Sequence, residues 1–77
     1  MTFNELDIVV VSKNLPDHGL KSGDVGTVVM VYAPDAVEVE FMTASGHTQA
    51  VVLTLSTDQL RPVSPKDLLA VRQLDAA

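Results

Sequence analysis

Apolar and polar residues along this chain alternate, or form short apolar blocks, as is typical of β-strands. Residues 37–41 read Val-Glu-Val-Glu-Phe, so their apolar side chains share one face while Glu38 and Glu40 share the other. Residues 7–12 form an apolar, mostly β-branched block, which predicts a strand buried on both faces. Three further strands are expected, over residues 25–32, 47–55 and 60–63.

Glycine and proline mark the connections. Residues 13–24 predict a long loop, because Pro16, Gly19 and Gly23 interrupt any regular element. Gly26 falls inside a predicted strand, which indicates a bulge or the sharp bend of a barrel corner. Turns are expected at residues 33–36 and 44–46, and a single helical turn at residues 56–59.

The C-terminal tail has a different pattern. Ser64 is a suitable N-cap, Pro65 suits the first helical position, and the apolar residues that follow recur at near-helical spacing. We therefore predict a helix of about ten residues, which is too short to be stable unless it docks on something. Docking on an open end of its own barrel is favoured, and insertion into a groove of a partner protein is the alternative.

This order of elements predicts an all-β fold: an SH3-like, five-stranded antiparallel barrel over residues 1–63, with a short C-terminal helix in the tail at residues 64–77. The chain has 77 residues, of which 47% are hydrophobic, with a mean hydropathy of +0.26. A small barrel cannot enclose so many apolar side chains, so we expect burial against a protein partner or a second copy. The chain has no cysteine, which fits a reducing cytoplasm.

The charge of the chain indicates which kinds of partner molecule it can bind. The formal net charge is −5, and the five basic residues are scattered along the sequence. Binding of nucleic acid normally requires a basic patch, so this balance argues against it and favours a basic protein partner. The first residues lack the features of a signal peptide, and no apolar run is long enough to span a membrane. A cytoplasmic protein is expected.

Few residues are candidates for catalysis, metal binding or phosphate binding. Glu38 and Glu40 lie about 7 Å apart along one strand face, a spacing that acid–base catalysis could use, but a solvated outer face is the favoured interpretation. His18 with Asp17 and Asp24 could hold a metal ion weakly, although exposed loop residues are again favoured. The glycine-rich loop leads into a strand rather than a helix, so it does not predict a phosphate site. We therefore expect no catalytic residue, cofactor or metal ion.

At the residue level, five blocks in order resemble a family of small uncharacterised bacterial SH3-like proteins, a domain of unknown function. The blocks are Leu6-Asp7-Ile8-Val9-Val10, Asn14-Leu15-Pro16-Asp17-His18-Gly19-Leu20, Gly23-Asp24-Val25-Gly26-Thr27-Val28-Val29, Val37-Glu38-Val39-Glu40-Phe41 and Leu55-Ser56-Thr57-Asp58-Gln59-Leu60-Arg61-Pro62. The resemblance covers roughly residues 6–63. It transfers no established activity. Members of the family resemble small partners encoded beside toxin-like proteins, which implies an antitoxin or immunity role.

The leading functional hypothesis is a non-enzymatic protein-binding module, with an antitoxin- or immunity-like role toward a basic toxin. The alternative is a KOW-type nucleic-acid-binding module, because the Gly-Asp-Val-Gly-Thr-Val block recurs in such barrels. An enzyme is the least favoured class, since no nucleophile, base and orienting group come together in the sequence. The residues that we expect to contact a partner are Leu68, Val71, Leu74, Asp17, His18, Asp24 and Tyr32.

Overall fold

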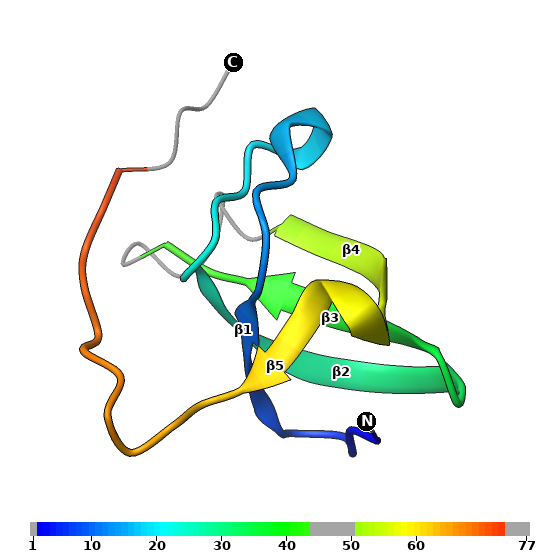
Figure 1. Cartoon of the computed structure of the whole chain (residues 1–77). Helices are drawn as coiled ribbons and strands as arrows, with labels where there is room; N and C mark the ends of the chain where they lie inside the picture. The colour runs from blue at the N-terminus through cyan, green and yellow to red at the C-terminus, as the bar shows by residue number, and fades with distance from the viewer. Residues whose placement is uncertain (1, 44–50, 74–77) are drawn as a thin grey trace.

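The structure of the protein, a computed structural model, describes residues 2–43 and 51–73 and contains a single five-stranded antiparallel sheet (Figure 1). Two short 3-10 helices, η1 (Pro16–His18) and η2 (Thr57–Gln59), lie in the connections. The strands are β1 (Ile8–Val11), β2 (Val25–Ala33), β3 (Ala36–Phe41), β4 (Val51–Ser56) and β5 (Leu60–Pro62).

The strand order across the sheet is β4-β3-β2-β1-β5. Strands β1 to β4 follow one another as a meander, and β5 then returns to pair antiparallel with β1. The predicted set of five antiparallel strands is thus confirmed. Closure into a barrel is not found: within the described residues, β4 and β5 are the two edges of an open sheet.

The core lies on one face of this sheet and is almost entirely aliphatic. Val39 is fully buried while its neighbours Glu38 and Glu40 point away, which confirms the inside and the outside predicted from the alternation. Burying such a side chain contributes about 1.5–3 kcal/mol. The core cluster contains Phe3, Val9, Val11, Leu15, Leu20, Val28, Val37, Val39, Phe41, Leu55 and Leu60.

Strand β1 is buried on both faces from Val9 to Val11, as its apolar block predicts, whereas Ile8 at its start is 50% exposed, contrary to that prediction. Val9 and Val11 face the core, and Val10, which faces the other way, is also only 3% exposed. Val10 lies between Val25 of β2 and Arg61 of β5 in the register of the sheet. The part of β1 that lies between β2 and β5 is therefore buried on both faces of the sheet.

Gly26 is needed for close packing rather than for a bulge. It pairs with Val9 in a regular register, and the register shifts of β2 fall later, between Val28 and Met30 and again before Ala33. A Cβ atom on Gly26 would lie 2.6 Å from Cγ1 of Val39, far inside van der Waals contact. The predicted bulge at Gly26 is therefore wrong, because the constraint there is the approach of β3.

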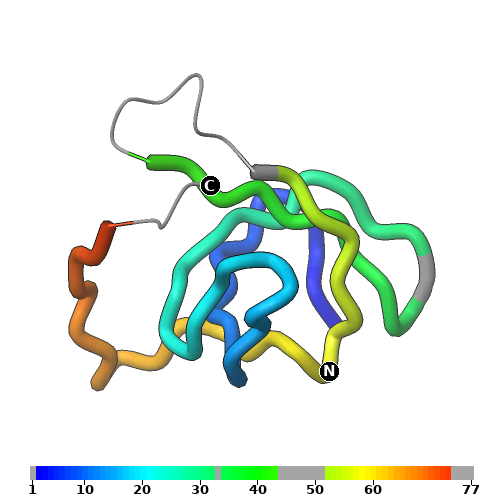
Figure 2. Tube along the Cα trace, turned by 90° about the horizontal axis from the view of Figure 1, so that it is seen from above, coloured from blue at the N-terminus to red at the C-terminus, as the bar shows by residue number. Residues whose placement is uncertain are grey.

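The predicted C-terminal helix is also wrong for the part of the tail that the structure describes, residues 64–73, which we call the tail. A single turn forms, in which the amide of Asp67 donates to the carbonyl of Ser64 at 3.0 Å. The carboxylate of Asp67 accepts from the amide of Ser64 and from the guanidinium of Arg61, so this N-cap pattern closes a local turn instead of starting a helix. Beyond it the chain is extended and stands away from the sheet (Figures 1 and 2).

Candidate functional site: a groove between the tail and the sheet

Two ion pairs between arginine and aspartate fasten the tail to the sheet. Near its start, Arg61 of β5 donates to both carboxylate oxygens of Asp67, at 2.9 and 3.0 Å. Near its end, Arg72 donates from Nε to Oδ1 of Asp24 at 2.7 Å and from Nη2 to Oδ2. Both contacts are two-pronged, the geometry in which a planar guanidinium binds a carboxylate best.

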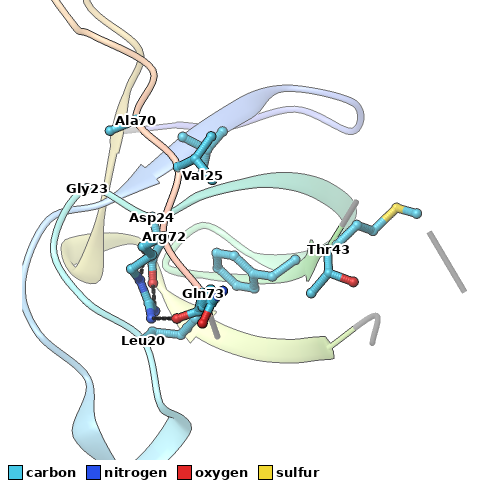
Figure 3. Close-up of a pocket in the computed structure, with 11 residues that line it drawn as sticks. Leu20, Gly23, Asp24, Val25, Thr43, Ala70, Arg72 and Gln73 are labelled. Carbon is cyan, nitrogen blue, oxygen red and sulfur yellow. Dashed lines mark hydrogen bonds and ion pairs between the residues drawn. The ribbon is translucent and has the colours of Figure 1, made fainter. Parts of the chain in front are cut away.

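The carboxylate of Asp24 is also held by its own loop, independently of Arg72. The residue lies directly before β2, and its carboxylate accepts from the amide of Lys21 at 2.8 Å, which closes the turn around Gly23. The Arg72 guanidinium, and then the Lys21 amide, hold the pKa of the Asp24 carboxyl below its usual range, although partial burial opposes them. Arg72 also donates to the carbonyl of Gly19 at 3.0 Å. The loop therefore presents a ready-made acceptor site for one arginine (Figure 3).

A groove of about 650 Å³ lies between the fastened tail and the sheet. On the sheet side, Leu20 and Phe41 are core residues whose edges reach it, while Val25 and Met42 are 42% and 55% exposed. The other wall is the tail, from Ala70 to Gln73. Figure 3 shows the Arg72–Asp24 pair close beside this space. The groove thus has an apolar floor and a charged end.

The tail carries apolar side chains that it does not bury. Leu68 is 93% exposed, Leu69 75% and Val71 99%. The hydrophobic effect therefore contributes almost nothing to holding the tail, and the two ion pairs and their hydrogen bonds do most of it. Exposed apolar side chains next to an apolar groove form a surface that favours contact with another apolar segment.

The structure brings together only some of the residues predicted to contact a partner. Asp24 and the tail residue Val71 both line the groove. Asp17 and His18 are exposed in η1, and Leu68 is exposed farther back on the tail. Leu74 lies outside the described residues.

Tyr32 belongs to a different surface. It is 53% exposed, and its hydroxyl donates to Oε2 of Glu38 at 2.9 Å. This carboxylate raises the pKa of the tyrosine hydroxyl, because losing the proton would break the hydrogen bond and place a second negative charge beside it. Tyr32 and Glu38 are thus neighbours on the side of the sheet away from the core.

The residues that the sequence suggested as metal ligands do not come together. Asp24, which the sequence offered as a metal ligand with Asp17 and His18, is instead bound to Arg72. Among residues 2–43 and 51–73, no three histidine, aspartate or glutamate side chains converge as a metal site.

Sequence reasoning missed Arg72 and Met42. Arg72 is an isolated base in the tail, 48 positions from Asp24, and nothing in the local pattern links the two. Met42 comes directly after the alternating strand, and its exposure of 55% follows from the end of that pattern. The exposed position of Met42 could have been read from the sequence, whereas the Arg72–Asp24 pair required the fold.

The structure is that of a small, mostly β domain with one antiparallel sheet and a groove whose floor is largely apolar. The chain belongs to the family described as Domain of unknown function (DUF4926), which matches residues 5–62. The match spans the sheet from just before β1 to the last residue of β5, and the tail lies beyond it. No curated protein and no solved structure matches the chain significantly. In the part of the chain that the structure covers, no helix has the length and apolar character needed to cross a membrane.

Proposed function

We propose that this domain is a non-enzymatic protein-binding module that holds an apolar segment of a partner protein in the groove between the tail and the sheet. The observation that carries the proposal is the groove itself, with Val25 and Met42 exposed on its floor and Val71 exposed on its far wall. A partner segment lying there would bury apolar surface from both sides, at about 25 cal/mol per Å².

A basic protein is the partner that the charge of the chain favours. The net charge is −5, and two of the five basic residues, Arg61 and Arg72, are already paired with aspartates. An acidic surface speeds association with a basic partner by electrostatic steering. An antitoxin or immunity protein that acts on a basic toxin in the cytoplasm would have this requirement, and the family resemblance described above supports the same role.

The strand order supports the more detailed fold that we infer from the sequence. A meander whose last short strand returns to β1 after a 3-10 turn is the layout expected of an SH3-like barrel. In that interpretation the open side between β4 and β5 corresponds to an incompletely closed barrel. The KOW-type alternative draws less support, because binding nucleic acid through Arg61 or Arg72 would mean breaking their ion pairs with aspartate.

The test is selection of peptides from a random display library on the immobilised domain, followed by calorimetry with the best binders. Met42→Asp places a charge on the groove floor, while Met30→Asp makes the same change at a similarly exposed methionine that does not line the groove. We expect apolar peptides to be selected, and Met42→Asp to weaken them by about tenfold or more while Met30→Asp leaves them within about twofold.

Equal losses in both variants, or no selected peptide that competes at the groove, would overturn the proposal. Coexpression with the product of the adjacent gene tests the antitoxin role separately. Copurification and relief of growth arrest are expected, and neither would be seen if that role is wrong.

A further inference from the structure

The side of the sheet away from the core is built like a second contact surface. We define the outer face by two rows of residues that are neighbours across the strands. The register places Ile8, Thr27, Glu40 and Val52 in one row, and Met30, Glu38 and Thr54 in the other. All of these side chains point away from the core, because their partners in the alternation, such as Val28 and Val39, are fully buried.

The composition of the outer face is unusual for a solvated sheet. Antiparallel sheets with one wet face normally alternate apolar-in with polar-out. Here three outward positions on three different strands carry large apolar side chains, with Ile8 50% exposed, Met30 46% and Val52 49%. They flank the two carboxylates of β3 rather than standing singly.

The charge on the outer face is entirely negative, and no ion pair among residues 2–43 and 51–73 balances it. Glu38 receives a hydrogen bond from the Tyr32 hydroxyl. Across the described segments, neither Glu38 nor Glu40 forms an ion pair with a basic side chain. The nearest arginine in the sheet, Arg61 on β5, lies across β1 and β2 from these glutamates and is bound to Asp67. Glu38 and Glu40 are both partly buried residues, and a cation beside a partly buried carboxylate is attracted more strongly than one beside a fully solvated carboxylate.

The negative charge and the exposed apolar side chains of the outer face together favour a partner that is both basic and apolar. We propose that the outer face docks a basic segment of a partner protein, in which two lysine or arginine side chains lie about 7 Å apart, matched to the spacing of Glu38 and Glu40, and apolar side chains flank them. The segment pairs its cations with the two carboxylates and lays its apolar residues on Met30 and Val52. A second copy of the chain is a poor occupant, since it would bring four carboxylates face to face.

This inference extends the proposed function, because it gives the basic partner a surface made of residues that do not line the groove. The groove would hold an apolar segment, and the outer face would recognise charge. The two surfaces use different residues, so variants can separate them. Met42 and Val71 line the groove and are not in the two rows of the outer face, while Glu38 and Glu40 do not line the groove.

The experiment uses as the probe a synthetic peptide in which serine alternates with valine, lysine, lysine and valine, so that an extended chain presents both lysines and both valines on one face. A block peptide of the same composition is its control. Binding to the domain is followed by calorimetry and by amide chemical shifts at low and at physiological salt. The double variant Glu38→Lys, Glu40→Lys removes the matched charges. The double variant Glu5→Lys, Asp58→Lys changes the net charge by the same amount at two exposed acids outside the outer face.

We expect the alternating peptide to bind the wild-type domain more tightly than the block peptide, with shifts centred on β3 and β4. The Glu38/Glu40 variant should lose about tenfold or more in affinity, and the Glu5/Asp58 variant about twofold or less. Equal losses in the two variants, no loss in the Glu38/Glu40 variant, or no binding of the probe would each overturn the inference. Val71→Ser, a neutral change on the tail side of the groove, should leave probe binding unchanged, so failure here leaves the groove proposal to its own test.

Discussion

At the residue scale, the most demanding position in the fold is Gly26. Its place in the sheet leaves no room for a side chain, because Val39 and Phe41 of β3 pack directly over its Cα atom. Gly19 and Gly23, by contrast, have open space around them and are needed for their positive φ angles of 69° and 98°. Glycine therefore serves two different physical purposes within one short stretch.

Gly26→Ala should lower the free energy of unfolding by about 1–3 kcal/mol, since the added methyl overpacks the core against Val39. Chemical denaturation measures this loss. Val39→Ala removes the side chain that the new methyl would meet, so the double variant should lose less than the two single losses added together. Strict additivity would mean that the contact between Gly26 and Val39 is not what makes the glycine necessary.

The Asp24–Arg72 pair predicts a pH dependence. Because the pKa of Asp24 is lower in the folded protein than the ordinary value of 3.8, the pair stabilises the native state fully above that value and loses this contribution as the pH falls below it. The contribution is about 1 kcal/mol or less, since the pair is partly exposed. Asp24→Asn should remove the corresponding part of the acid sensitivity, measured as the unfolding midpoint between about pH 2 and 6. An unchanged acid profile would contradict the assignment.

At the element scale, the strands follow from the sequence and the tail does not. The alternation in β3 fixes which of its side chains are buried, because only one orientation of the strand places all of its apolar side chains in the core. The apolar block in β1 indicates instead a strand with buried residues on both faces. The tail has a good N-cap pattern at Ser64, yet Asp67 uses its carboxylate to bind Arg61, a residue outside the tail. A short helix without a docking surface is marginal, so these ion pairs prevail. Local patterns cannot reveal pairs that are brought together by the fold.

Arg72→Ala should release the end of the tail without unfolding the sheet. We expect limited proteolysis within residues 64–73 to become faster, while amide protection in β1 to β3 is kept, because no core residue comes from the tail. Lys66→Ala is the matched control, since Lys66 is an exposed tail residue that forms no ion pair with any described side chain. Equal proteolysis rates in the wild type and the Arg72→Ala variant would show that the ion pair does not fasten the tail.

At the scale of the whole molecule, the sequence predicted more apolar surface than the fold can enclose, and the structure shows where it lies. Val25, Met42 and Val71 are exposed around the groove, and Met30 and Val52 are exposed on the outer face. The existence of this surplus could be predicted from composition. Its distribution over the surface could not, because it depends on the register of the strands and on the path of the tail.

The central claim is that the groove between the tail and the sheet is where a partner is bound. The most direct measurement is an amide chemical-shift titration of the isotope-labelled domain with the tightest apolar peptide selected on it. The largest shifts should fall on Val25, Met42, Thr43 and Val71, and should disappear with Met42→Asp. Shifts centred on Glu38, Glu40 and Val52, or spread evenly over the sheet, would contradict the claim.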